Sequence, residues 1–149
     1  MLMTLFLCLG FMMAVLYIDL MFDVSAVPYR KTGAALPPAV LDPITHYYGR
    51  ITQNPYVLMF VMLTTTICLG AEIYYNLAPR WAGYASLALM GLSMVTGTVK
   101  VIPTAQRLGS AQDSPEARTK MVHGMLPAHL VLLVNILLLT SIQFLVAGS

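Results

Sequence analysis

Three ionisable residues, Asp19, Lys100 and His129, stand inside or at the edges of long apolar runs, where charge is costly. A histidine or carboxylate held away from water can take a proton from a bound molecule, and a nearby lysine stabilises the negative charge that develops. In this interpretation His129 or Asp19 is the general base, and Lys100 is its electrostatic partner. The substrate would be a hydrophobic molecule that enters from a lipid bilayer.

The three histidines suggest a second kind of site. Imidazole and carboxylate groups are competent ligands for iron, copper or zinc. A metal or haem site would therefore use His46, His123 and His129 with Asp19 or Asp23, and His46 and His123 are the candidate cofactor-binding residues. The spacing of these residues matches no metal-binding motif, and the sequence does not identify a metal or cofactor.

A structural interpretation explains the same residues without chemistry. Asp19 and Lys100 would form an ion pair, and the histidines would hydrogen-bond at the membrane interface, because polar pairs of this kind hold membrane helices together. Further intramembrane polar residues are Glu72, Asn135 and Gln143. Glu72 is either a hydrogen-bonded structural carboxylate or part of a proton relay.

Composition places the chain among membrane proteins. Its 149 residues are 58% hydrophobic and 9% charged, whereas soluble domains carry about 25% charge. The net charge of +2 includes no basic cluster that would suggest nucleic acid. Cys8 and Cys68 form neither a metal-binding spacing nor a disulfide framework. A chain of this size is expected to form one integral membrane domain over residues 1–149.

Four apolar runs are long enough to cross a bilayer as helices, at residues 2–22, 55–77, 81–102 and 121–147. Only helices satisfy the backbone in lipid when the chain does not close into a barrel. The first run is interpreted as a helix and not as a cleaved leader, because no lysine or arginine precedes it. The predicted fold is therefore all-α, a four-helix transmembrane bundle whose partners are the bilayer and further membrane subunits.

Two long connections separate these runs, at residues 23–54 and 103–120. Asp42 followed by Pro43 predicts a short helix. Tyr47 and Tyr48 suit this helix to a position at the membrane surface. Ser114 followed by Pro115 predicts a helix that continues into the last span. The connection between the second and third spans is short and predicts an antiparallel hairpin.

The distribution of basic residues predicts the orientation. Of the eight lysines and arginines, only Arg80 lies at the opposite end from the two long connections, which hold or adjoin the other seven: Arg30, Lys31, Arg50, Lys100, Arg107, Arg118 and Lys120. Cytoplasmic loops carry the excess of positive charge. We therefore expect a multi-pass protein of a bacterial-type inner membrane, with both termini outside and connections 23–54 and 103–120 in the cytoplasm.

Each predicted span carries its polar residues mostly on one face at 100° per residue, which indicates a partly polar interior. These faces hold Cys8, Met12, Asp19 and Asp23 in the first span, Thr65, Cys68, Glu72 and Asn76 in the second, Ser93, Thr96 and Lys100 in the third, and His129, Thr140 and Gln143 in the fourth. Asn135 and His123 lie on a different face from His129.

The segment after the third span resembles part of a known family. Pro103, Arg107 and Leu108 form a Pro-x-x-x-Arg-Leu pattern, and His123 follows at the start of the last span. This arrangement is similar, over about a third of the chain, to small four-helix bacterial membrane proteins related to anthrone oxygenases. Residues 119–121 stand where that family has a tryptophan. The resemblance implies a four-helix fold and oxidative chemistry on a lipophilic aromatic.

The sequence leaves three functions open. The first is a structural or accessory membrane subunit that binds a partner, in which the polar groups are paired and packed. The second is a small membrane oxidoreductase acting on a lipophilic substrate, in which Asp19, Lys100 and His129 converge on a cavity facing the cytoplasm, with His46 or His123 at its mouth. The third is proton-coupled transport, which needs Glu72 to connect to the cytoplasmic cluster.

Overall fold

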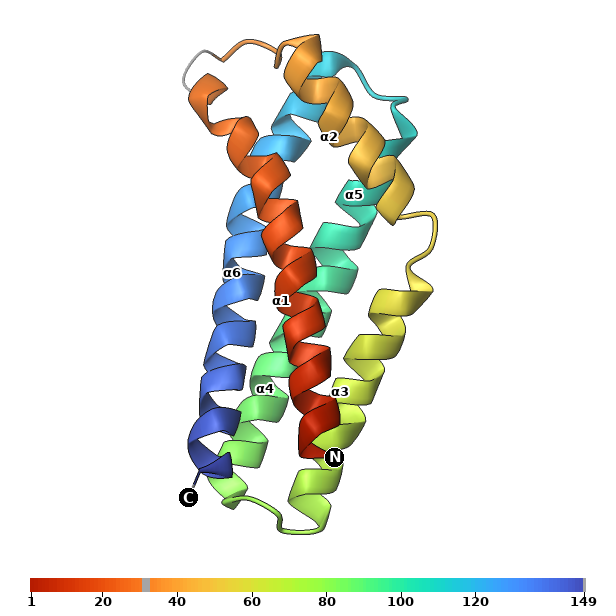
Figure 1. Cartoon of the computed structure of the whole chain (residues 1–149). Helices are drawn as coiled ribbons and strands as arrows, with labels where there is room; N and C mark the ends of the chain where they lie inside the picture. The colour runs from red at the N-terminus through yellow and green to blue at the C-terminus, as the bar shows by residue number, and fades with distance from the viewer. Residues whose placement is uncertain (31–32, 149) are drawn as a thin grey trace.

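Four long helical segments form the body of the molecule, and each is long and apolar enough to span a membrane. The structure is a computed structural model that describes residues 1–30 and 33–148. Its long segments are α1 (Leu2–Ser25), α3 (Tyr56–Tyr74), α4 (Arg80–Thr96) with its extension, and α6 (Pro115–Ala147) (Figure 1). The prediction of an all-α four-helix bundle is confirmed.

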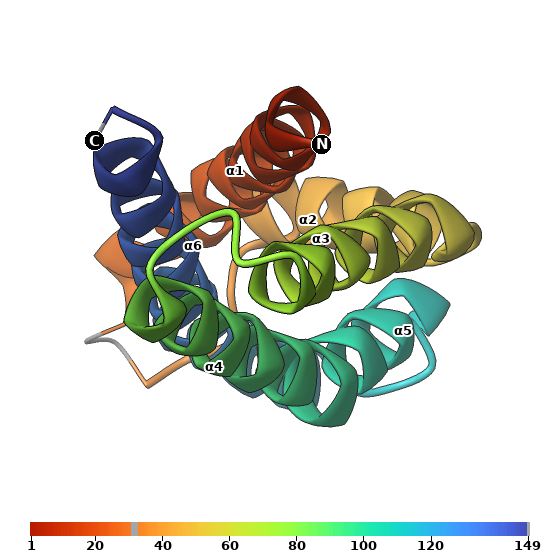
Figure 2. The same ribbon diagram turned by 90° about the horizontal axis from the view of Figure 1, so that it is seen from below.

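The four segments pack as a closed antiparallel bundle. Helix α1 contacts α3 and α6, and α4 contacts the same two helices from the other side (Figure 2). Both termini and the α3–α4 connection lie at one end, and the short helices α2 (Pro38–Ile51) and α5 (Ile102–Ser110) lie at the other (Figure 1). The predicted hairpin of the second and third spans is confirmed, with α3 ending at Tyr74.

Buried apolar side chains form two separate cores. The larger core lies between the four long helices and contains Leu5, Leu9, Met12, Leu16, Cys68, Leu69, Met90, Leu132, Ile136 and Leu139. The smaller core lies where α2 and α5 cover the end of the bundle, and it contains Ala26, Leu36, Leu41, Ile44, Tyr48, Ala105, Leu108, Val122 and Met125. Asp19, Asp23 and His129 belong to neither core, although all three are buried.

The third span extends further than predicted. We expected it to end at residue 102 and residues 103–120 to form a polar connection. Instead α4 continues through a π-helical turn, η2 (Gly97–Val101), into α5, and only four residues separate α5 from α6. Pro103 explains the widened turn, because its ring excludes the usual hydrogen bond to the carbonyl four residues earlier. Ala105 and Leu108 then keep α5 helical by packing against α2.

The helix in the first connection also begins earlier than predicted. The start signal at Asp42–Pro43 is wrong, because α2 begins at Pro38 and carries Pro43 in its interior. Pro38 supplies the fixed φ angle that suits a first helical position. Leu41, Ile44 and Tyr48, spaced by three and four residues, form one buried face. The start signal at Ser114 is confirmed, since its side chain accepts the backbone N–H of Ala117.

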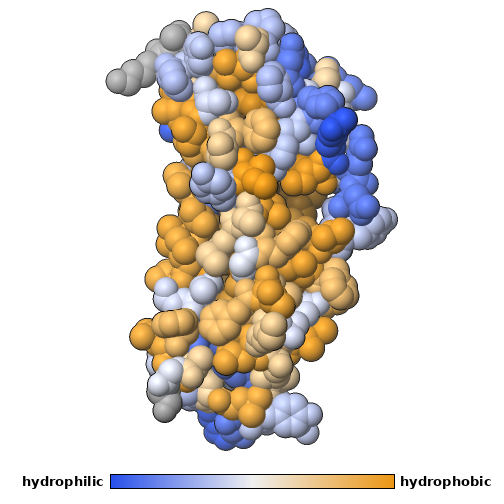
Figure 3. Space-filling model, in the orientation of Figure 1, coloured by the Kyte–Doolittle hydropathy of each residue, from blue (hydrophilic) through white to orange (hydrophobic). Residues whose placement is uncertain are grey.

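The outer surface changes character along the bundle. Hydrophobic side chains cover the long middle of the face in Figure 3, and hydrophilic side chains gather at the end formed by α2 and α5. Many large apolar residues of the long helices are exposed, among them Leu7, Phe60, Ile67, Val95, Val134 and Phe144. This distribution matches a helical bundle with lipid around its long helices and water at its ends.

Helices α2 and α5 touch through their backbones at Gly49 and Gly109. A Cβ atom added at Gly109 would lie 2.6 Å from the Cα and N atoms of Gly49, and one added at Gly49 would lie 3.1 Å from the Gly109 carbonyl oxygen. Glycine therefore sets how closely α5 approaches α2. This contact fixes α2 over the end of the bundle.

We predict that Gly109→Ala destabilises the fold by about 1–3 kcal/mol. The added methyl group would overlap the backbone of Gly49, which can move only together with helix α2. The free energy of unfolding in detergent measures this loss. Gly91→Ala is the control, because no atom lies within 4 Å of its added Cβ, and alanine favours the helix. Equal stability of both variants would contradict the prediction.

Candidate functional site

A buried polar cluster lies between the two apolar cores. Asp19 and Asp23 are four residues apart on α1, so their side chains lie one above the other on the same face of the helix. His129 projects from α6 toward them and is fully buried. The cluster joins the end of α1 to the middle of α6, which is far away in sequence, and α2 covers it.

Asp23 makes the shortest contact in the cluster. Its Oδ2 atom lies 2.6 Å from Nδ1 of His129, and both side chains are fully buried. Its other carboxylate oxygen, Oδ1, accepts the hydroxyl of Tyr48 at 2.9 Å. A buried carboxylate is stable when donors satisfy its oxygens. Two donors from α2 and α6 therefore hold Asp23 in one position.

Asp19 occupies the other side of the imidazole ring. Its Oδ1 atom accepts the hydroxyl of Tyr47 at 2.7 Å, and its Oδ2 atom lies 3.7 Å from Nε2 of His129. The Tyr47 ring stacks on Phe22, with 4.2 Å between centroids. The distance of 3.7 Å is too long for a hydrogen bond but short enough for electrostatic attraction to a protonated imidazole.

These contacts assign the protonation of His129. Nδ1 carries a hydrogen and donates it to the Asp23 carboxylate, because a short contact to a carboxylate needs a donor. In the neutral ring Nε2 then holds a lone pair, and this buried atom has no hydrogen-bond partner within the described residues. A histidine oriented by a carboxylate, with its second nitrogen free, is the arrangement of a general base.

A cavity of about 160 Å³ opens beside His129 and Asp19. A second hollow of about 70 Å³ adjoins it and shares the lining residues Val15, Asp19, Leu58, Val101, Ile102 and His129. Apolar side chains form most of both walls. The widened turn η2 provides Val101, and Ile102 follows it directly, so the predicted end of the third span instead forms one wall of the cavity.

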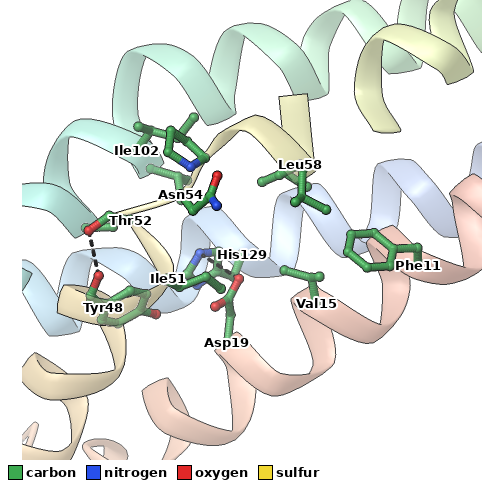
Figure 4. A pocket seen from close by; sticks show the side chains of 14 residues that line it. Phe11, Val15, Asp19, Tyr48, Ile51, Thr52, Asn54, Leu58, Ile102 and His129 are labelled. Atoms are coloured by element: carbon green, nitrogen blue, oxygen red, sulfur yellow. Dashed lines mark hydrogen bonds and ion pairs between the residues drawn. The ribbon is translucent and has the colours of Figure 1, made fainter. Parts of the chain in front are cut away.

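Figure 4 shows how the cavity is arranged. His129 and Asp19 lie at its inner side, and Phe11 and Val15 of α1 and Leu58 of α3 continue its wall along the bundle. Phe11 is 42% exposed and Val57, also in the lining, is 53% exposed. Ile51 at the end of α2 and Asn54 in the connection to α3 also line the cavity and are exposed, so the opening lies where α1, α3 and the α2–α3 connection meet.

Lys100 is not part of this site. The predicted ion pair with Asp19 is wrong: Lys100 is exposed on η2, lines neither hollow and makes no ion pair within the described residues. The expectation assumed regular 100° steps along the third span. The π-helical turn breaks that phase and directs Lys100 outward.

The two other histidines also lie elsewhere. His46 is exposed in an open groove with Arg50 and Arg118, and His123 lines a different depression with Arg30 and Lys120. Neither stands at the mouth of the His129 cavity, and the three histidines do not converge. No group of three potential metal ligands occurs in residues 1–30 and 33–148. The expected convergence of His46, His123 and His129 on one metal site is therefore wrong.

The remaining intramembrane polar residues form a second cluster near the opposite end. Gln143 donates its amide to the Ser86 hydroxyl at 3.0 Å, and its side chain also lies beside the Glu72 carboxyl group. All three residues are buried. Asn135 is buried between the two clusters, and its Nδ2 atom has no partner in the described part of the chain. Gln143 therefore links α6 to α3 and α4.

Sequence reasoning missed the contribution of Tyr47 and Tyr48 to the site. The sequence suits both tyrosines to the membrane surface, yet their hydroxyl groups point inward to Asp19 and Asp23. The sequence did contain a signal for this role. Two aspartates four residues apart in an apolar helix need hydrogen-bond donors from other segments. Burial first, and the neighbouring carboxylates second, raise the pKa of both tyrosines well above the ordinary value.

A search of protein families, curated proteins and solved structures finds no match for this chain. The class of the protein therefore follows from its own architecture, a four-helix bundle of the membrane-spanning type with a buried histidine–aspartate site. The resemblance to the anthrone-oxygenase-related family remains a prediction.

We predict that Tyr48→Phe lowers the free energy of unfolding by about 1.5–3 kcal/mol at neutral pH, because Asp23 loses one charged hydrogen bond. The folded protein holds the Tyr48 proton more tightly than the unfolded chain does. Wild-type stability therefore falls as pH rises above about 10, and the difference from Tyr48→Phe narrows. Tyr17→Phe is the control, because Tyr17 is 64% exposed. Unfolding in detergent at several pH values measures both effects.

Proposed function

We propose that this protein binds a small lipophilic molecule in the cavity beside His129 and removes a proton from it. The observation that carries the proposal is the free Nε2 atom of His129, buried at the cavity wall while Nδ1 is held by Asp23 at 2.6 Å. A purely structural histidine would have both nitrogens satisfied. His129 lines the cavity, so a ligand that fills it lies against the imidazole ring.

The proton transfer breaks one bond and forms one bond. An acidic X–H bond of the bound molecule breaks, its hydrogen joins Nε2, and the electron pair stays on the molecule. The imidazolium that forms lies between Asp23 on one side and Asp19, 3.7 Å from Nε2, on the other. Two carboxylates in a site of low polarity stabilise this charge more than water would. Tyr47 and Tyr48 keep both carboxylates in position.

The cavity favours a lipophilic ligand of small size. Its walls are mostly apolar, and the exposed part of its lining includes the apolar side chains of Phe11 and Val57, which we place toward lipid. An engineered apolar cavity of about 150 Å³ holds benzene. The hollow of about 160 Å³, with its neighbour of about 70 Å³, therefore suits a molecule built on an aromatic ring.

Oxidative chemistry is the wider function that we propose for this site. An anion formed by proton removal gives up electrons more easily than the neutral molecule, so the His129 step prepares an aromatic substrate for oxidation by an external acceptor. The resemblance to oxygenases implies that this acceptor is dioxygen. The resemblance to the anthrone-oxygenase-related family implies the same class of substrate. The protein is thus proposed to be a small membrane oxidoreductase acting on a lipophilic aromatic compound.

The two other functions receive less support from the geometry. An accessory subunit was expected to have its polar groups paired and no cavity, whereas Nε2 of His129 is free beside one. Proton-coupled transport needs Glu72 to reach the histidine. Glu72 lies beside Gln143, which is about 21 Å from His129 along α6, and the larger apolar core fills the interval.

We predict that the wild-type protein in nanodiscs binds 4-nitrophenol and lowers its apparent pKa by at least about one unit, because His129 accepts the phenol proton. The visible absorbance of the phenolate measures this ionisation below the probe's own pKa. His129→Gln should abolish the shift. The matched controls His46→Gln and His123→Gln should retain it, because neither residue lines the cavity. An equal phenolate signal in His129→Gln nanodiscs would exclude proton transfer to this residue.

The location of the site within the cell is also a proposal. The excess of basic residues near α2 and α5 supports a bacterial-type inner membrane with that end in the cytoplasm and both termini outside. The cavity then lies near the cytoplasmic boundary of the bilayer.

We predict opposite labelling of two single-cysteine variants made in a chain that carries Cys8→Ala and Cys68→Ala. Leu77→Cys, in the α3–α4 connection, should react with a membrane-impermeant maleimide in spheroplasts. Gln112→Cys, between α5 and α6, should react only after lysis. Both positions are exposed, so accessibility depends on the side of the membrane. The reverse pattern would invert the orientation.

A further inference from the structure

Asn54 lies in the connection between α2 and α3 and lines the cavity that contains His129. The other polar side chains in this lining are Asp19, Tyr48, Thr52 and His129. The hydroxyl groups of Tyr48 and Thr52 already donate, to Asp23 and to the Tyr48 carbonyl respectively. Asp19 accepts from Tyr47, and the Nδ1 hydrogen of His129 is given to Asp23. Within the described chain, the Asn54 amide is therefore the free donor of this cavity.

Asn54 stands where a helix-capping residue is expected, but its side chain does not cap α3. Asparagine followed by proline just before a helix usually caps that helix with its side chain. Helix α3 begins at Tyr56 directly after this pair, yet it has no side-chain capping hydrogen bond. The Asn54 side chain instead points into the cavity, on the side across from His129 (Figure 4).

We propose that the Asn54 amide donates a hydrogen bond to an oxygen of the substrate that becomes negative when His129 removes the proton. This inference rests on the proposed function and names its substrate class. The substrate is a lipophilic phenol, or an aromatic ketone with an acidic C–H bond beside the carbonyl group.

The chemistry balances for both kinds of substrate. In a phenol the O–H bond breaks, the hydrogen joins Nε2 of His129, and the electron pair remains on oxygen. In a ketone the C–H bond breaks, the hydrogen joins the same atom, and the electron pair moves through the carbon–carbon bond onto the carbonyl oxygen. Each reaction creates an oxyanion, and a fixed N–H donor beside such an oxygen lowers the energy of the charged state.

Electrostatics orient the substrate in the same way. Asp19 lies 3.7 Å from Nε2 of His129, so an oxyanion on that side would face a carboxylate. The opposite wall offers the amide of Asn54 and apolar side chains such as Ile102 and Leu58. The oxygen that becomes negative is therefore stabilised when it accepts the Asn54 amide on its side away from Asp19. The difference between the Asp19 side and the Asn54 side of the cavity favours a molecule that carries an oxygen over a hydrocarbon of equal size.

The test uses full-length protein in nanodiscs with 4-nitrophenol as the probe. Asn54→Leu keeps the branched shape of the side chain but removes the donor, and we expect it to reduce the ionisation constant of the bound phenol about 10-fold or more. Asn54→Asp should reduce it further, because it places a carboxylate beside the phenolate. Binding of nitrobenzene, which has no proton to lose, should change less than 2-fold in Asn54→Leu. Gln53→Leu is the matched control, since this neighbouring amide does not line the cavity.

The outcomes separate the two proposals. The role of Asn54 would be overturned if both Asn54 variants ionise the phenol as the wild type does. If His129→Gln loses this ionisation at the same time, the proposed function still stands. Full ionisation in His129→Gln would overturn both. Equal loss of nitrobenzene and phenolate binding in Asn54→Leu would also overturn the donor role, because it would show that the residue only shapes the cavity.

Discussion

The contact of 2.6 Å between Asp23 and His129 is the interaction on which the arrangement of the site depends. A buried carboxylate is costly without donors, and a buried histidine needs a defined proton position. Each residue satisfies the other and ties the end of α1 to α6. Tyr48 adds the second donor to Asp23, so the same contact also determines where α2 must lie.

The buried polar cluster also helps to fix the packing of the helices. It separates a core among the long helices from a core beneath α2 and α5. Apolar packing alone does not fix how the two cores are rotated against each other, because it has little direction. The hydrogen bonds of Asp19 and Asp23 do have direction, and they fix that rotation. The close contact of Gly49 with Gly109 sets the remaining distance.

The sequence predicted the fold well because length, apolarity and helix formation are coupled in lipid. Its enzyme interpretation also brought Asp19 and His129 together, since each is an ionisable member of an apolar helix face. It failed for Lys100, because a π-helical turn changes the angular phase and periodicity assumes a constant one. It failed for the roles of Tyr47 and Tyr48, because their direction depends on how α2 folds back over the bundle. Local patterns give the face of a helix but not what another segment places against it.

The cavity opens beside exposed apolar residues of α1 and α3, and this has a consequence for how it fills. A ligand that reaches it from the hydrocarbon phase is present there at a concentration set by its partition coefficient. Occupancy then depends on the amount dissolved in the membrane and only indirectly on the amount in water. Compounds of very low aqueous solubility can saturate such a site, and a weak intrinsic affinity is enough.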